Sequence, residues 1–385
     1  MADPGPGPGP DQGRPGRRRR RLAAGALLGA PLTLAGCGAA APATLVVATP
    51  STAPPHPATS PIPRPELLVA VLERRGGART PNLVAIVGLD GRARARASFT
   101  QRAVPGAGAL TAVLQPEARV VGGAVYYADG LGVVRRLTPQ GGDPPTVATF
   151  PITSDQQAVA IAVSPDGRRL MATVLTVQPW HVDVEVAPAG GPTVTVRSID
   201  VAATEPGTAP RLLQLTGWDA TGPVALPDGL PAQAQDDAGG LWQGHPAHLD
   251  GHGLAGPPLG GPTCGASFEE PDGTLLCDDA QGSTTTLRRP DGVVIHRFAH
   301  TGGGPRLSPD GRRLAYSLGG GRSAVQAWDG TTVPLAGGFT PSGWLDGDLL
   351  IGNTGGEELA YVDLSAPGRA VDMGFRGAFV GVVQG

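Results

Sequence analysis

The chain carries SPDGRRLAY at residues 308–316 and SPDGRRLMA at residues 164–172, two copies of one motif that begin 144 residues apart. In such a motif Pro fixes φ for a turn, the Asp side chain can bond its own backbone two residues on, and Gly supplies φ > 0. An apolar run follows each copy, so the motif predicts a β-hairpin whose second strand begins after the Gly. A hairpin that recurs along a chain indicates a repeat architecture.

Looser copies of the turn extend the repeat. We predict turns between a first and a second strand near Pro116, Asp166, Asp219, Asp272, Asp310 and Asp346, at spacings of 36 to 53 residues, which bracket a four-stranded propeller repeat. The turn residues of four copies are Asp166 and Gly167, Asp272 and Gly273, Asp310 and Gly311, and Asp346 and Gly347. Further turns lie at residues 290–292, 19 residues after Asp272, and at residues 328–330, 19 residues after Asp310. They predict the hairpins between the third and fourth strands of these blades.

The two ends of the repeat region complete each other. Strand-like runs at residues 67–72, 83–87 and 93–99 make three strands, and the apolar run at residues 378–383 has no turn after it. If this last run joins the first three, an all-β propeller of seven four-stranded blades closes with no free edge; six blades is the alternative count. Residues 227–262 lack clean alternation and predict an irregular blade or a long loop.

The N-terminus predicts an export signal rather than part of the fold. Arg17–Arg21 precede an apolar run at residues 22–33 that is too short to span a bilayer, and residues 34–37 read LAGC. This box resembles the bacterial lipobox, which implies a lipid on Cys37; an ordinary signal peptide with an incidental Cys is the alternative. We expect a signal peptide over 1–36, a Pro/Ala/Thr-rich tether over 37–65 and a propeller over 66–385. The general secretory and twin-arginine routes both stay open.

Composition limits the partners. The chain has 60 Gly, 41 Pro and 30 basic residues, all Arg, which is typical of a GC-rich genome such as that of an actinomycete. Its net charge is −3, and the predicted signal peptide removes six Arg with only two Asp, so the remaining body is more acidic. An acidic body argues against nucleic acid as a partner.

The turn motif with its following strand resembles the WD40-like repeat of TolB-type β-propellers, over roughly residues 66–385. The resemblance implies an extracytoplasmic protein that binds other envelope proteins. Two departures stand against membership of a Tol complex, namely the lipobox and the lack of an additional N-terminal domain of the TolB kind. We therefore expect a monomer, anchored to the membrane by lipid on its extracytoplasmic face, that binds an envelope protein or a small envelope ligand.

Catalytic motifs are not found. The chain holds no Gly-x-Ser-x-Gly elbow, and its nearest approach, GASFE at residues 265–269, lacks the second Gly. We expect a non-catalytic module with no cofactor. A propeller hydrolase or lactonase with a divalent metal ion, and a module that binds cell-wall carbohydrate, are the alternatives.

Three smaller groups of residues are candidates for special roles. His245, His248 and His252, with Asp250, are the raw material of a metal site, although a solvated loop is the favoured interpretation. Cys264 and Cys277 flank the Asp272 turn and favour a disulfide in an exported chain; two small buried side chains are the alternative. Trp218 and Trp344 each follow Gly near a turn, which favours packing between blades over an aromatic binding platform.

Overall fold

The computed structural model describes the chain from residue 66 to residue 383 with internal gaps. The described residues are 66–73, 81–100, 104–105, 111–112, 118–177, 179–201, 212–229, 245–261, 264–269, 273–278, 284–299 and 302–383. Every structural statement below concerns these residues. The expected signal peptide, Cys37, the tether, Pro116 and Asp272 lie outside them.

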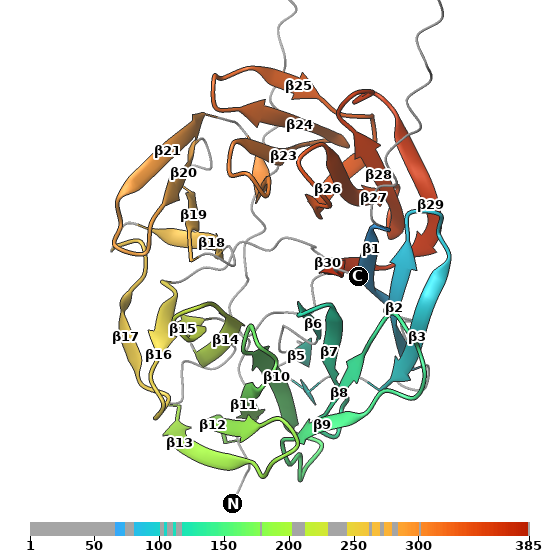
Figure 1. Cartoon of the computed structure of the whole chain (residues 1–385). Helices are drawn as coiled ribbons and strands as arrows, with labels where there is room; N and C mark the ends of the chain where they lie inside the picture. The colour runs from blue at the N-terminus through green and yellow to red at the C-terminus, as the bar shows by residue number, and fades with distance from the viewer. Residues whose placement is uncertain are drawn as a thin grey trace, which may run out of the picture. The chain divides into compact units, whose positions relative to one another are not determined.

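The described residues form seven four-stranded antiparallel sheets arranged as blades around a ring (Figure 1). They contain no helix, and so none that is long and apolar enough to cross a membrane. Within each blade the strands run in order from the centre of the ring to its rim, so the fourth strand is the outer edge. We number the blades 1 to 7 in chain order.

The strands of blades 1 to 4 are given from the inner strand outward. Blade 1 holds β30 (Ala378–Val383), β1 (Leu68–Glu73), β2 (Asn82–Gly88) and β3 (Ala93–Phe99). Blade 2 holds β6 (Ala118–Val121), β7 (Ala124–Ala128), β8 (Val133–Leu137) and β9 (Thr146–Thr149). Blade 3 holds β10 (Gln157–Val163), β11 (Arg169–Thr176), β12 (His181–Pro188) and β13 (Val194–Asp200). Blade 4 holds β14 (Leu212–Trp218), β15 (Pro223–Gly229), β16 (Ala247–Leu249) and β17 (Ala255–Pro258).

Blades 5 to 7 follow the same plan, and one short ribbon lies between blades 1 and 2 in the chain. Blade 5 holds β18 (Gly265–Glu269), β19 (Leu275–Asp278), β20 (Thr284–Arg288) and β21 (Val294–Ala299); blade 6 holds β22 (Gly303–Leu307), β23 (Arg313–Gly319), β24 (Arg322–Ala327) and β25 (Thr332–Pro334); blade 7 holds β26 (Phe339–Trp344), β27 (Leu349–Thr354), β28 (Glu358–Asp363) and β29 (Ala370–Arg376); the ribbon pairs β4 (Val104–Pro105) with β5 (Thr111–Ala112).

The C-terminal strand closes the ring, as its apolar sequence predicts. β30 pairs antiparallel with β1, from Leu68 opposite Val383 to Leu72 opposite Ala378, with a bulge after Ala70. It supplies the inner strand that the three N-terminal strands lack (Figure 1). The count of seven blades is therefore confirmed, and the alternative of six is wrong.

The repeated motif forms the same hydrogen-bonded turn in blades 3 and 6. In blade 3, Ser164 Oγ donates to Asp166 Oδ1 at 2.6 Å, and the backbone N–H of Arg168 donates to the same oxygen at 3.0 Å. The N–H of Arg169 then donates to Ser164 Oγ at 2.9 Å. The matching bonds recur in residues 308–313. Gly167 and Gly311 have φ of 70° and 69°, which confirms the left-handed conformation that the motif predicts.

Other predicted turns follow the motif less closely. In blade 7 Asp346 Oδ1 accepts hydrogen bonds from the N–H groups of Asp348 and Leu349, but Gly347 is not left-handed. The prediction near Pro116 is wrong, because the first hairpin of blade 2 turns at Gly122 and Gly123, with φ of 53° and 74°. Two consecutive left-handed residues make a tight hairpin by themselves, so no Pro or Asp is needed to mark it.

The hydrophobic core lies between the blades. Among the described residues, seven apolar clusters form, and each joins two neighbouring blades. Alternate side chains of a strand point to opposite faces of its sheet, so one strand can contribute to two interfaces. In β1, for example, Leu68 and Ala70 pack toward blade 2, whereas Val69 and Val71 pack toward blade 7.

Candidate ligand pocket between blades 3 and 4

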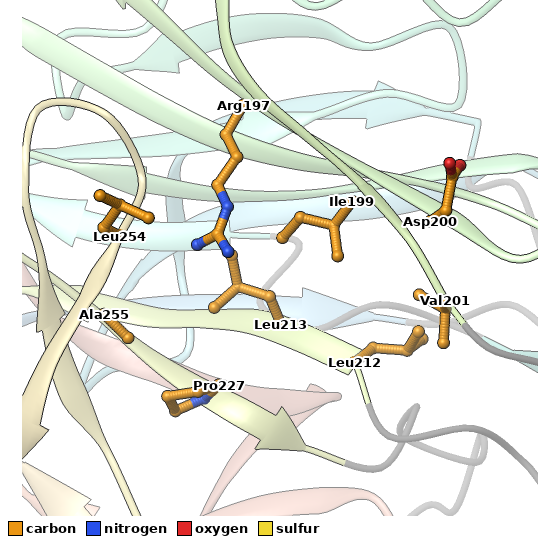
Figure 2. A pocket seen from close by; sticks show the side chains of 9 residues that line it. All are labelled: Arg197, Ile199, Asp200, Val201, Leu212, Leu213, Pro227, Leu254 and Ala255. Carbon is orange, nitrogen blue, oxygen red and sulfur yellow. The ribbon is translucent and has the colours of Figure 1, made fainter.

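A pocket of about 440 Å³ opens where the rim of blade 3 meets blade 4 (Figure 2). Most of its lining is aliphatic, and two of its side chains are charged. The lining residues are Arg197, Ile199, Asp200, Val201, Leu212, Leu213, Pro227, Leu254 and Ala255.

The pocket exists because the outer part of blade 4 is thin. β16 has three residues and pairs with β15 at only two positions, Val224 with His248 and Ala225 with Ala247. β17 is short and fully exposed, and it carries two Pro. The seven-residue β13 of blade 3 therefore has no equally long neighbour across the interface. Its face toward blade 4 stays partly open to solvent.

Arg197 is the charged side chain that enters this space. Figure 2 shows its guanidinium group directed between Leu254 and Ile199, with Leu213 below it. Its Nη1 donates a hydrogen bond to the carbonyl oxygen of Gly253 at 2.8 Å, which ties β13 to the turn before Leu254.

Asp250 builds that turn. Its Oδ1 accepts hydrogen bonds from the N–H groups of Leu254 and His252, both at 2.8 Å. The bond from Leu254 is the main reason why the pKa of Asp250 lies below its usual value, and the nearby charge of Arg197 adds a smaller contribution. The Asp250 carboxylate thus holds the turn through backbone N–H groups, and Arg197 contacts the turn only at the carbonyl oxygen of Gly253.

Asp200 belongs to a different cluster on the opposite face of β13. Its carboxylate points away from Arg197 (Figure 2), and its Oδ1 lies 2.8 Å from His181 Nδ1. His181 Nε2 lies 3.0 Å from Asp183 Oδ1, which also accepts a hydrogen bond from Ser198 Oγ. Burial would lower the pKa of His181, but the hydrogen bonds to both carboxylates outweigh it and raise the pKa. Ser198 therefore faces a carboxylate, and both nitrogens of His181 are already engaged.

Glu185 lies beside this cluster, on β12. Its side chain is 8% exposed, and its Oε2 has no hydrogen-bond partner in the described part of the chain. Burial, and secondarily the charge of Asp183, raises the pKa of the Glu185 carboxyl. A raised pKa favours the neutral form, which removes the cost of burying a charge.

The predicted histidine cluster does not converge in the structure. His245 Nδ1 donates to the carbonyl oxygen of Cys264 at 2.7 Å, and His248 Nε2 lies 2.8 Å from the buried carboxylate of Asp219. His248 is part of β16, so the prediction that it lies in a solvated loop is wrong. No group of three or more metal-ligating side chains is found within the described residues.

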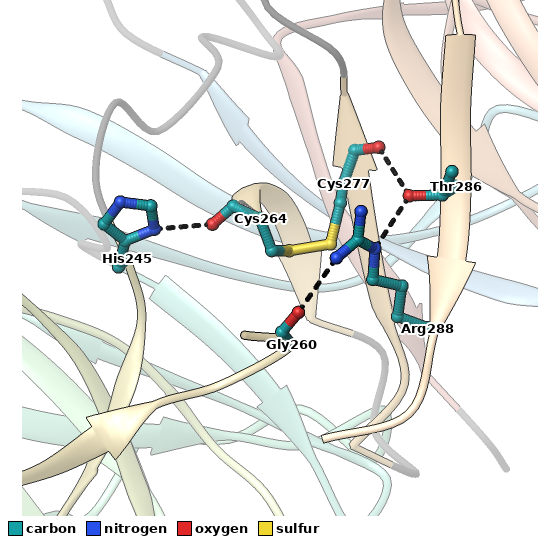
Figure 3. Close-up of a disulfide and its surroundings, with 6 residues drawn as sticks. All are labelled: His245, Gly260, Cys264, Cys277, Thr286 and Arg288. Atoms are coloured by element: carbon teal, nitrogen blue, oxygen red, sulfur yellow. Dashed lines mark hydrogen bonds between the residues drawn. A yellow bond between two sulfur atoms is a disulfide. The ribbon is translucent and has the colours of Figure 1, made fainter. Parts of the chain in front are cut away.

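Cys264 and Cys277 form a disulfide with a Cα–Cα distance of 5.0 Å (Figure 3). Cys264 directly precedes β18 and Cys277 lies in β19, so the bond joins the first hairpin of blade 5. Its surroundings tie blade 5 to blade 4, because Arg288 Nη1 donates to the carbonyl oxygen of Gly260 at 3.1 Å. The two Cys belong to the small apolar cluster between these blades.

Both predicted tryptophans lie at blade interfaces. Trp344 of blade 7 is 6% exposed, and its Nε1 donates to the carbonyl oxygen of Arg306 in blade 6 at 2.9 Å. Trp218 of blade 4 packs under the guanidinium of Arg169 from blade 3, whose carbon lies 5.3 Å from the ring centroid. This arrangement agrees with packing between blades.

The residues that line the pocket belong to none of the motifs in the sequence. Arg197, Ile199 and Val201 alternate along one face of β13 and its end, and that alternation is the only signal of the pocket in the sequence. It does not reveal that blade 4 leaves the face uncovered.

The chain matches no protein-family model and no curated protein. Among solved structures it is similar to the tricorn protease, with 13% identity and a TM-score of 0.37 over 68% of this chain, which spans only 26% of that protein. It is also similar to a Lactobacillus plantarum protein (13% identity, 83% of this chain, 98% of that chain, TM-score 0.41). A Bacteroides caccae protein of unknown function is a third (10% identity, 82% of this chain, 98% of that chain, TM-score 0.33). Likenesses this distant carry no argument about function.

Proposed function

We propose that this protein is a membrane-anchored envelope lipoprotein whose propeller is a non-catalytic binding module, with the pocket between blades 3 and 4 as its ligand site. The observation that carries the proposal is the pocket itself, whose lining residues are mostly aliphatic and include the charged Arg197 and Asp200. Its volume of about 440 Å³ falls within the range of roughly 300–1,000 Å³ that small-molecule sites occupy. Apolar walls with a few oriented polar groups are the usual composition of such sites.

The chemistry nearby supports binding over catalysis. A serine nucleophile of the Ser–His type needs an imidazole nitrogen that is free to accept the proton of its hydroxyl. The Ser198 hydroxyl donates to Asp183, and both nitrogens of His181 lie against carboxylates, so this cluster is arranged as a charge network. It holds β12 to β13, and residues of β13 line the pocket.

The sequence supports the cellular address. The LAGC box at residues 34–37 follows a basic and apolar leader, and the resemblance to TolB-type propellers also implies an envelope protein. The Cys264–Cys277 disulfide suits an oxidising compartment outside the cytoplasm. Two or more acyl chains on Cys37 would hold the protein stably on a membrane.

Replacing Cys37 by Ser tests the anchor. The wild-type protein should sediment with membranes, and the variant should be recovered from the soluble fraction. A variant that still sediments and is still processed to the same mass refutes lipid attachment at this residue.

Native mass spectrometry of protein recovered from its own cell envelope tests the binding site. Leu254 lines the pocket and is 50% exposed, so Leu254→Asp changes the pocket without removing a core residue. We expect an additional small mass on the wild-type protein that this variant lacks. Leu131, which is 62% exposed in a turn of blade 2, supplies the matched control, and Leu131→Asp should keep the mass. Equal occupancy in all three proteins refutes the assignment of the site.

A further inference from the structure

The chemical class of the ligand follows from the way in which Arg197 is held. Its Nη1 is engaged by the carbonyl oxygen of Gly253, and no other hydrogen bond of this side chain is found within the described residues. This leaves the parallel N–H groups of Nε and Nη2 for a ligand in the pocket that Arg197 lines. That edge of a guanidinium matches the two oxygens of a carboxylate.

Asp200 and Asp250 lie near Arg197, and other groups engage their carboxylates. Asp200 turns its carboxylate to the other face of β13, where His181 engages it. Asp250 directs its Oδ1 to two backbone N–H groups. Within the described part of the chain, neither forms an ion pair with Arg197. Arg197 thus lines the pocket without an ion pair to either carboxylate, and Asp200 is the second charged residue of the lining.

The rest of the lining selects an apolar body. Ile199, Val201, Leu212 and Leu213 form a continuous aliphatic surface that belongs to, or packs against, the buried cluster between blades 3 and 4. These four side chains carry no hydrogen-bonding group, so Arg197 and Asp200 are the polar side chains of the pocket. A ligand that buries CH₂ groups here gains about 0.8 kcal/mol for each one.

We propose that the pocket binds an aliphatic monocarboxylate, with the carboxylate paired to Nε and Nη2 of Arg197 and the hydrocarbon chain against the aliphatic surface. This inference rests on the proposed function, because it takes the pocket as the ligand site. It adds to that function the head group of the ligand, the charge of this group and the orientation of the ligand in the pocket. A free fatty acid and an acyl chain with a terminal carboxylate share this chemistry.

Isothermal titration calorimetry with decanoate tests the proposal. The protein is the full chain with Cys37→Ser, purified without detergent, because detergent would compete for the pocket. Decanol has the same chain without the charge, decylamine reverses the charge, and acetate has the carboxylate without the chain. We expect 1:1 binding of decanoate, binding of decanol that is about 10- to 100-fold weaker, and no detectable binding of decylamine or acetate.

Two pocket variants and one control separate the contributions. Arg197→Met should bring decanoate down to the affinity of decanol, whereas Arg197→Lys keeps the charge without the planar fork and should fall between them. Arg197 also holds Gly253, so Leu254→Asp serves as a second variant that places a competing carboxylate beside an intact Arg197. It should abolish decanoate binding, and Leu131→Asp should not.

The outcomes distinguish this inference from the proposed function. If decanoate and decanol bind equally and Leu254→Asp removes both, the pocket is a ligand site but the carboxylate assignment is wrong. If decanoate does not bind while the envelope-derived mass still depends on Leu254, the inference fails and the site stands. If Leu131→Asp weakens binding as much as Leu254→Asp, decanoate binds elsewhere and the inference is overturned.

Discussion

Replacing Gly167 by Ala should destabilise the propeller more than replacing Gly311 by Ala, although the two residues occupy the same place in the same motif. Both are left-handed, with φ of 70° and 69°, and an Ala in this conformation costs about 1 kcal/mol. A Cβ on Gly311 would meet only Leu287 Cδ2 at 4.0 Å, an ordinary contact. A Cβ on Gly167 would lie 2.5 Å from the hydroxyl oxygen of Tyr126 in blade 2.

The extra cost at Gly167 comes from the surroundings of Tyr126. This side chain is 5% exposed and belongs to the cluster between blades 2 and 3, so its ring cannot move freely. Overpacking of a core costs about 1–3 kcal/mol, which gives a total of about 2–4 kcal/mol for Gly167→Ala. Gly347→Ala is the control, because Gly347 is not left-handed and its Cβ would have no neighbour within 4 Å.

Urea unfolding of the purified chain measures these differences. In a Tyr126→Phe background, which lacks the hydroxyl, Gly167→Ala should cost no more than Gly311→Ala does. Equal destabilisation by Gly167→Ala and Gly311→Ala in the wild-type background would refute the packing argument. A loss for Gly347→Ala as large as that for Gly311→Ala would refute the conformational one.

Three further predictions concern the ring closure, the disulfide and the charge network. Deleting residues 378–385 should lower the thermal midpoint or cause aggregation, whereas deleting only 384–385 should do neither; equal midpoints contradict the closing role of β30. Cys264→Ser with Cys277→Ser should cost about 3 kcal/mol for the 13-residue separation, and an unchanged urea midpoint under oxidising conditions contradicts this. The pKa of His181 is raised in the folded state, so His181 stabilises the fold fully at pH values below its unfolded-state pKa. This stabilisation is lost as the pH rises through the folded-state pKa. His181→Gln should remove that pH dependence, and a midpoint-against-pH curve identical to wild type contradicts it.

The turn motif predicts the hairpins of blades 3 and 6 because their geometry is local. Ser164, Asp166 and Gly167 supply the hydroxyl, the carboxylate and the left-handed residue that the turn needs, all within four positions. The closure by β30 is also predictable. The N-terminal region supplies three strands of a four-stranded blade, and the C-terminal region supplies one apolar strand without a partner, so pairing the two completes the blade.

The pocket could not be predicted, because it depends on a relation between two blades. Arg197 and Ile199 alternate on β13 as they would on any half-buried strand. What opens the space is the brevity of β16 and β17, which lie about 50 residues later in the chain. The hairpin at Gly122 is missed for the opposite reason, because two glycines make it without the Pro and Asp that mark the other turns.

The pairing of β1 with β30 also fixes the order in which the fold can be completed. Leu68 and Val383 are neighbours in one sheet, so blade 1 cannot acquire its inner strand until residues 378–383 have been synthesised. Contacts between such distant residues form slowly, because closing a loop of this length costs conformational entropy. Until then β1 keeps an unpaired apolar edge, at which a nascent or truncated chain would associate with another strand. The first blade to emerge from the ribosome is thus the last to become complete.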